Sequence, residues 1–122
     1  MKVLIATQKP FAAAAVKGIR EILEGAGHEV VLLEKYAEAK DLIDAVSDVE
    51  AMIIRSDKVT PEVLDAAKKL KIVVRAGAGF DNVDLAAATA HGVVVENTPG
   101  QNANAVAELA IALMIFMSRN QF

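Results

Sequence analysis

Cysteine and tryptophan are absent from this chain of 122 residues, and aromatic residues make up only 4% of it. The absence of cysteine excludes a disulfide framework, a thiolate metal site and a thiol nucleophile together. With so few aromatic side chains, the core must be aliphatic, which is feasible because 54% of the residues are hydrophobic. The composition therefore predicts a globular domain packed from Val, Ile, Leu and Ala.

An excess of charge of either sign is also missing. The net charge of -3 comes from 13 basic and 16 acidic residues that are interspersed along the chain, which argues against nucleic acid or an anionic membrane as a partner. The longest apolar run, residues 109–117, is too short to span a bilayer, and the N-terminus lacks the apolar run of a signal peptide. We expect one soluble domain over residues 1–122, located in the cytoplasm.

Short apolar runs alternate with helical patterns along the whole chain, which is typical of a parallel sheet with crossover helices. The expected strands are residues 2–6, 29–33, 51–54, 72–75 and 93–96. The expected helices follow Pro10, span 41–46, start at Thr60-Pro61, span 84–90 and span 103–118. This predicts an α/β fold: a flavodoxin-like, doubly wound five-stranded sheet of order 2-1-3-4-5 with helices on both faces.

Several residues mark where these helices begin and end. Thr60-Pro61-Glu62 combines a capping hydroxyl, a proline at the first helical position and an acid near the positive helix end. Lys68 and Lys69 are expected at the other end of that helix, where the dipole favours cations. Glycines at 25, 27 and 92 follow helical patterns and are expected to end them. His28 and His91 lie beside two of these glycines and are expected to be exposed capping residues.

The expected helix over residues 103–118 is apolar on all sides. Leu113 and Phe116 fall on one side of a helical wheel, whereas Ile111, Met114 and Ile115 fall on the other. A helix of this kind is expected to be buried all round, but a flavodoxin-like layer covers only one side. We therefore expect a homodimer formed through Ile111, Met114 and Ile115, either face to face or by exchange of the helix. The alternative is a helix that folds back onto its own sheet.

Ligands of open α/β sheets bind beyond the carboxyl ends of the strands. Four polar or small-residue segments are expected there: 6–9, Arg55-Ser56, 76–79 and 97–99. The small residues of 76–79 let backbone N–H groups approach an anion, and the Arg55 guanidinium can fork onto a carboxylate or phosphate. The plainer interpretations are a tight turn after a strand and a salt bridge from Arg55 to Asp57 or Asp81.

Two of these segments carry a family resemblance. The residues VRAGAGFDNVD (74–84) and NTPGQNANAVAE (97–108), with Arg55-Ser56 upstream, resemble the substrate-binding domain of the D-2-hydroxyacid dehydrogenases, and most of all the members that oxidise 3-phosphoglycerate. The resemblance extends from Met1 to about Asn120. Ala78 and Gly100-Gln101 depart from the residues that are common in the family.

The resemblance implies substrate ligands and also what the chain is not expected to do. Arg55, Ser56, Ala76, Gly77 and Asn102 match positions that bind the 2-hydroxy acid. In the family, NAD and the catalytic Arg, Glu and His belong to a nucleotide-binding domain that follows this point. We therefore expect an isolated or engineered substrate-binding lobe that is catalytically inactive alone, with no cofactor, no metal and weak or no small-molecule binding.

Two other classes share the fold and the length. A signalling receiver domain is suggested by Asp57, which follows the third strand, but a receiver needs a pair of acids after the first strand to hold Mg²⁺. This chain has Thr7-Gln8-Lys9 there. A flavodoxin needs a hydroxyl-rich phosphate loop after the first strand and aromatic rings against the flavin. The loop TQKPF contains one Thr, and the chain has one Tyr and no Trp.

Overall fold

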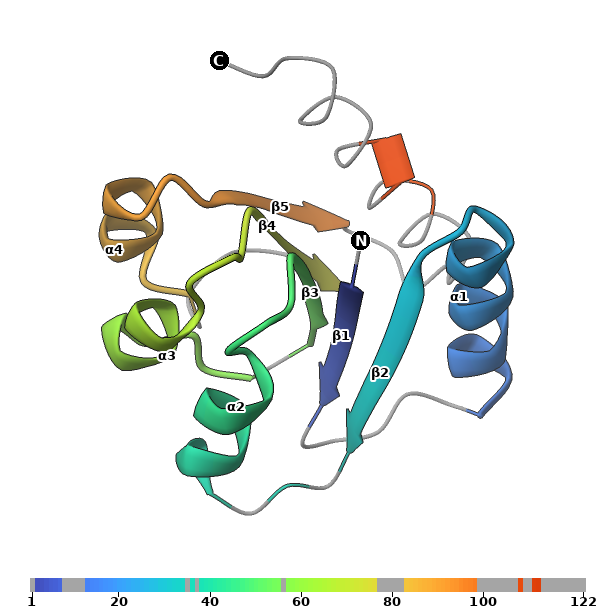
Figure 1. Cartoon of the computed structure of the whole chain (residues 1–122), viewed down its shortest axis with the longest axis horizontal. Helices are drawn as coiled ribbons and strands as arrows, with labels where there is room; N and C mark the ends of the chain where they lie inside the picture. The colour runs from blue at the N-terminus through green and yellow to red at the C-terminus, as the bar shows by residue number, and fades with distance from the viewer. Residues whose placement is uncertain are drawn as a thin grey trace.

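A five-stranded parallel sheet of order β2-β1-β3-β4-β5 forms the centre of the molecule (Figure 1). The computed structural model describes residues 2–7, 13–34, 36, 38–55, 57–76, 83–98, 108 and 111–112. The strands are β1 (Lys2–Thr7), β2 (Glu29–Glu34), β3 (Ala51–Ile54), β4 (Ile72–Ala76) and β5 (Val94–Thr98). The helices are α1 (Ala13–Gly25), α2 (Ala39–Ala45), α3 (Pro61–Ala66) and α4 (Leu85–Ala90). The predicted fold class and strand order are confirmed.

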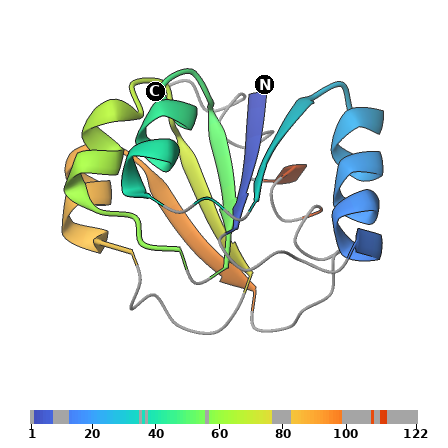
Figure 2. The same cartoon turned by 90° about the horizontal axis from the view of Figure 1, so that it is seen from below.

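Helices cover both faces of the sheet. Helix α1 lies on one face, and α2, α3 and α4 lie on the other (Figure 2). Strand residues alternate between two core clusters, since Leu4, Met52 and Val73 pack under α2–α4, whereas Ile5 and Ile53 pack under α1. All of these side chains are completely buried. Burial on both faces explains why β1 and β3 are apolar runs rather than alternating patterns.

The predicted helix ends agree with the structure in most places. The Thr60 hydroxyl accepts a hydrogen bond from the Val63 N–H at 3.3 Å, as a capping residue should. Asp84 caps α4 in the same way, accepting from the Ala87 N–H at 2.9 Å. Gly27 and Gly92 follow α1 and α4 with φ of 91° and 71°, a region in which residues with a Cβ are strained. These local signals therefore set the end of α1, the start of α3 and both ends of α4.

The expected limits of α2, which spans Ala39–Ala45 rather than 41–46, and the expected end of α3 were wrong. Helix α2 starts at Ala39 because Glu38 is its N-cap residue. Asp41, the third residue of the helix, completes the capping box, since its carboxylate accepts the Glu38 N–H at 3.4 Å. Helix α3 ends at Ala66, so Lys68 and Lys69 lie beyond its last turn. The chain leaves α3 after six residues because Leu70 has to turn into the core before β4 begins.

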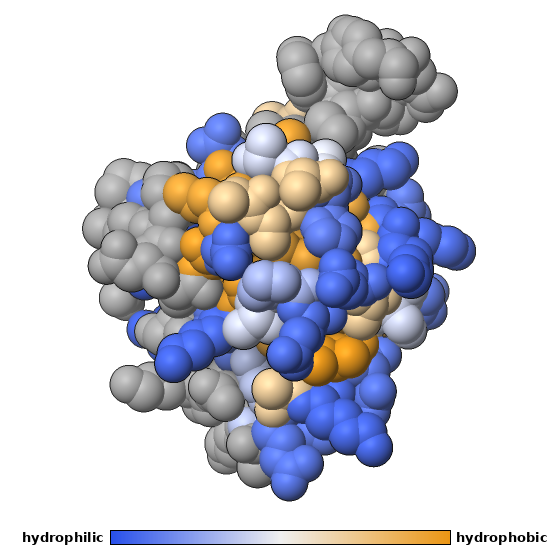
Figure 3. All heavy atoms as spheres, turned by 90° about the vertical axis from the view of Figure 1, so that its left-hand side faces the viewer, coloured by the Kyte–Doolittle hydropathy of each residue, from blue (hydrophilic) through white to orange (hydrophobic). Residues whose placement is uncertain are grey.

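The outer surface mixes charged and apolar side chains. Figure 3 shows the side of the molecule that carries α3 and α4, where hydrophilic residues surround small apolar patches. Among the described residues, the large hydrophobic side chains classed as exposed are Leu32 and Leu85. Also within the described part of the chain, no helix is both long enough and apolar enough to cross a membrane.

Candidate functional site

The strand register brings the carboxyl ends of the central strands together. Ala6 of β1 is paired with Ile54 of β3, and Ile54 is paired with Arg75 of β4. Arg55, the first residue after β3, therefore lies between the ends of β1 and β4. Neighbouring strands lie about 4.8 Å apart. The edge at which the sequence predicted a ligand site is thus a single compact surface.

The structure describes two of the five predicted substrate ligands. Arg55 follows β3 and is half-buried, and Ala76 is the last residue of β4. Ser56, Gly77 and Asn102 lie outside the described residues. Arg55 and the backbone of Ala76 are brought to the same edge of the sheet, as the sequence predicted.

The backbone of Arg55 is held from both sides. Its N–H donates to Oδ1 of Asp57 at 3.4 Å. Its carbonyl oxygen accepts from Nε of Arg75 at 3.1 Å. Arg75 therefore supports the backbone of the residue that was predicted to bind the substrate.

A buried tyrosine completes this arrangement, and the sequence did not reveal it. The Tyr36 hydroxyl, in the connection after β2, donates a short hydrogen bond to Oδ2 of Asp57. Tyr36 is 9% exposed and Asp57 only 2%. Burial, and then the hydrogen bond and negative charge of Asp57, raise the pKa of Tyr36 far above its usual value. Tyr36 thus remains a neutral donor at every physiological pH.

The same contacts bear on the receiver alternative. A phospho-acceptor carboxylate has to be open to a phosphoryl donor. Asp57 is instead buried, and both of its oxygens accept hydrogen bonds from the chain itself. Asp57 therefore lacks the exposure that a receiver requires.

The loops that carry these residues are anchored further along the chain. Val59 and Val83 form an isolated parallel bridge, and the N–H of Asp84 donates to the Val59 carbonyl at 3.0 Å. Both valines are buried. The segments that follow β3 and β4 are therefore tied to each other before α3 and α4 begin.

Thr7, at the carboxyl end of β1, has a completely buried hydroxyl with no hydrogen-bond partner among the described residues. In β1, Val3 and Ile5 point to the face of α1, and Thr7 shares that side because strand side chains alternate. A buried hydroxyl without a partner costs about 1–3 kcal/mol. Thr7 therefore places a buried hydroxyl, without a hydrogen-bond partner among the described residues, beside the candidate site.

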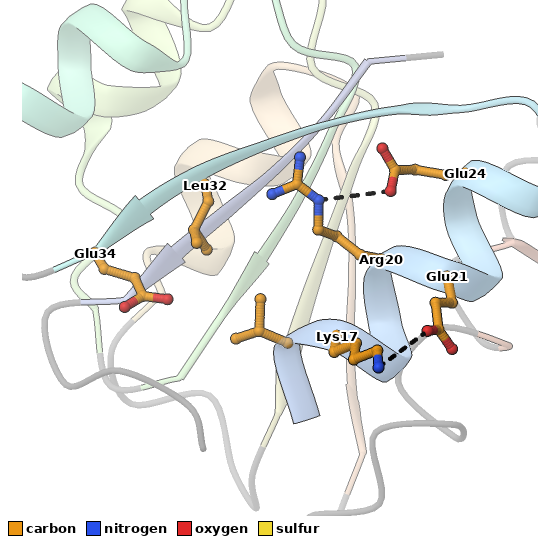
Figure 4. A pocket seen from close by; sticks show the side chains of 7 residues that line it. Lys17, Arg20, Glu21, Glu24, Leu32 and Glu34 are labelled. Atoms are coloured by element: carbon orange, nitrogen blue, oxygen red, sulfur yellow. Dashed lines mark ion pairs between the residues drawn. The ribbon is translucent and has the colours of Figure 1, made fainter. Parts of the chain in front are cut away.

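A separate groove of about 460 Å³ lies between α1 and the edge strand β2. Val16 and Leu32 line it. Figure 4 shows ion pairs along its rim, from Lys17 to Glu21 at 3.9 Å and from Arg20 to Glu24 at 3.5 Å. Glu34 also lines it, so three carboxylates stand against two cations. The groove is therefore less suited to an anionic ligand than the edge that carries Arg55.

The histidines lie away from this edge. His91 caps α4, with Nδ1 2.8 Å from the Ala87 carbonyl oxygen and Nε2 2.8 Å from Oδ1 of Asp65. The Ala87 contact, followed by the Asp65 contact, raises the pKa of His91. Burial, followed by the positive charge of the N-terminus, lowers the pKa of His28. In the described ranges, no group of three or more acidic or histidine side chains could hold a metal ion.

The structure describes only Glu108, Ile111 and Ala112 of the expected helix over 103–118, and all three are helical. Ile111 is half-buried and packs against the core cluster under α1. It therefore contacts its own sheet, although the helical wheel assigned it to the side available for dimerisation. Met114 and Ile115 lie outside the described residues.

The chain resembles known proteins over nearly all of its length. Residues 4–120 match the family described as D-isomer specific 2-hydroxyacid dehydrogenase, catalytic domain. The D-3-phosphoglycerate dehydrogenase of Sus scrofa is 46% identical over 101 residues, which is 82% of this chain and 19% of that protein. The enzyme of the same name from Archaeoglobus fulgidus is 44% identical over 98% of this chain and 21% of its own length. The chain thus spans about a fifth of these relatives.

Solved structures agree with the fold. An NAD⁺-bound 3-phosphoglycerate dehydrogenase from Entamoeba histolytica superposes with a TM-score of 0.81 and 57% identity, over 95% of this chain and 38% of that one. The D-lactate dehydrogenase of Escherichia coli gives a TM-score of 0.67 at 28% identity, over 96% of this chain and 37% of that one.

Proposed function

We propose that this chain, which belongs to the family of D-isomer specific 2-hydroxyacid dehydrogenases, is the substrate-binding lobe of such an enzyme. Its proposed ligand is 3-phosphoglycerate. The proposal is supported most directly by Arg55, which is held through its backbone at the carboxyl edge of the sheet, between the ends of β1 and β4. Three of the relatives named for this substrate share 44–57% identity with the chain. A fourth, which is assigned the same name, shares 30%, and the D-lactate dehydrogenase shares 28%.

Two kinds of donor meet the two anionic groups of such a ligand. Backbone N–H groups of Ala76 and Gly77 are assigned to the carboxylate, since a turn of small residues lets the main chain come close. The Arg55 guanidinium is assigned to an anionic oxygen pair, for which its planar fork is suited. Ser56 and Asn102 complete the proposed set of ligands.

The proposal assigns no redox chemistry to the 122 residues themselves. Hydride transfer needs NAD together with a positioned acid and base, and the residues named above are binding groups. We therefore propose that this polypeptide alone binds 3-phosphoglycerate weakly, in the millimolar range, binds no NAD and shows no NAD-linked turnover. Homodimerisation through Met114 and Ile115 and a cytoplasmic location are further parts of the proposal, whereas Ile111 packs against its own domain.

The proposal is tested by titrating the purified ¹⁵N-labelled chain with 3-phosphoglycerate and following amide shifts. Replacing Arg55 with Gln should weaken binding at least about tenfold, because a charge-assisted fork is lost. The matched control is Arg20→Gln, which removes a cation from the groove beside α1 and should leave binding unchanged. Equal binding by the wild-type chain and the Arg55 variant would refute the assignment.

A further inference from the structure

The peptide groups on both sides of the Arg55 Cα are restrained by side chains. Asp57 accepts the N–H, and Arg75 donates to the carbonyl oxygen. These two bonds fix the direction in which the Cα–Cβ bond leaves the backbone. A long, flexible side chain loses less conformational entropy on binding when the backbone that carries it is already fixed.

Burial of the Asp57 carboxylate destabilises the fold unless both of its oxygens accept hydrogen bonds. A buried carboxylate is strongly disfavoured without hydrogen bonds, and Asp57 is 2% exposed. Its Oδ1 is engaged by the Arg55 N–H and its Oδ2 by the Tyr36 hydroxyl. Since Tyr36 lies after β2 and Asp57 after β3, the carboxylate ties two loops of the carboxyl edge together.

We propose that Tyr36, Asp57 and Arg75 are positioning residues that hold Arg55 in the orientation in which it binds an anionic group of the ligand. This inference rests on the proposed function, because it assumes that Arg55 contacts the ligand. Tyr36 and Asp57 act only through Arg55 and need no contact with the ligand themselves.

The change in ligand affinity on substituting Asp57 distinguishes a positioning role from a purely electrostatic effect of its charge, because the two predict changes of opposite sign. Asp57→Asn removes a negative charge from the neighbourhood of an anion site, so electrostatics alone predicts tighter binding. Positioning predicts weaker binding, because the amide of the variant has one acceptor oxygen and an NH₂ donor, so it cannot accept the Arg55 N–H and the Tyr36 hydroxyl at the two positions where the carboxylate does. Tyr36→Phe changes no charge, so positioning alone affects its result.

The experiment compares Asp57→Asn and Tyr36→Phe with the wild-type chain, using 3-phosphoglycerate and inorganic phosphate as ligands. Asp48→Asn is the matched control, since Asp48 pairs with Lys2 at the opposite edge of the sheet and its loss changes the net charge equally. The chemical shift and exchange rate of the Arg55 amide are read in the free protein, and the dissociation constant is read by titration.

We expect both test variants to bind 3-phosphoglycerate about tenfold more weakly, the size expected for loss of one hydrogen bond to a charged group. Their Arg55 amides should shift and exchange faster, and the control should match the wild type in both readouts. Unchanged or tighter binding by folded Asp57→Asn or Tyr36→Phe would overturn the inference while leaving the proposed function intact. A wild-type chain that binds neither ligand would overturn both.

Discussion

The two edges of the sheet place their charged residues in opposite ways. At the amino edge, ion pairs lie open to solvent, with Lys2 2.6 Å from Asp48 and Lys71 3.9 Å from Glu50. At the carboxyl edge, Asp57 is buried together with Tyr36. Exposed pairs contribute little to stability, whereas a buried polar group is costly when it loses its partner. The amino edge should therefore tolerate substitution, and the carboxyl edge should not.

The largest difference between the edges is expected from removal of one aspartate at each. Asp57→Ala leaves the Tyr36 hydroxyl and the Arg55 N–H without their acceptor and should lower the free energy of unfolding by about 2–4 kcal/mol. Asp48→Ala should leave the urea midpoint nearly unchanged. Circular dichroism during urea unfolding measures the midpoint of each variant. Equal midpoints would show that the two edges do not differ in their tolerance to substitution.

A smaller effect is expected from Tyr36→Phe, which keeps the ring and removes only the hydroxyl. The Asp57 carboxylate loses one of its buried donors, so the free energy of unfolding should fall by about 1–2 kcal/mol. The same urea titration checks this value. A variant as stable as the wild type would show that the hydroxyl is dispensable to the carboxyl edge.

Thr7 should respond in the opposite direction. Thr7→Val keeps the shape of the side chain and removes a buried hydroxyl that has no partner among the described residues. The ligand-free protein should become more stable by up to about 1 kcal/mol. Thr7→Ser, which retains the hydroxyl, is the control and should bring no gain. Loss of stability in Thr7→Val would show that the hydroxyl is satisfied in solution.

The smallest effect is expected from His91, an exposed residue near the amino edge. Contacts with the Ala87 carbonyl and Asp65 raise its pKa above the usual 6.5. Because the folded chain then binds the proton more tightly than the unfolded chain, this stabilisation is complete below pH 6.5 and is lost as pH rises through the raised pKa.

The check is the difference in unfolding free energy between wild type and His91→Gln as a function of pH. Taking this difference removes the contribution of His28, whose pKa is lowered and whose effect has the opposite sign. The difference should shrink as pH rises above 6.5. A difference that grows with pH would contradict the contacts of His91.

Most of the fold could be predicted because its signals are local. The strands β1 and β3 are short apolar runs that are buried on both faces. The caps at Thr60 and Asp84 depend on residues three positions apart. The end of α3 could not be predicted in this way. It depends on where Leu70 has to enter the core, which is a property of the whole sheet.

In the candidate site too, features that depend on local sequence could be predicted, whereas contacts between distant residues could not. The place of Arg55 follows from the end of a strand, and so does that of Ala76. The contact between Tyr36 and Asp57 joins residues 21 positions apart in two loops, and no sequence period links such positions. The packing of Ile111 on its own sheet was likewise hidden, because a helical wheel ranks the sides of a helix without showing which one meets the domain.

The proposed function requires that the Arg55 edge, rather than any other surface of the chain, binds a phosphorylated 2-hydroxy acid. Mapping amide shifts during a titration with 3-phosphoglycerate tests it most directly. We expect the largest shifts at Arg55, at Ala76 and at their neighbours along the carboxyl edge. Shifts that cluster on α1 around Lys17 and Arg20, or no shifts at millimolar ligand, would contradict the proposed function.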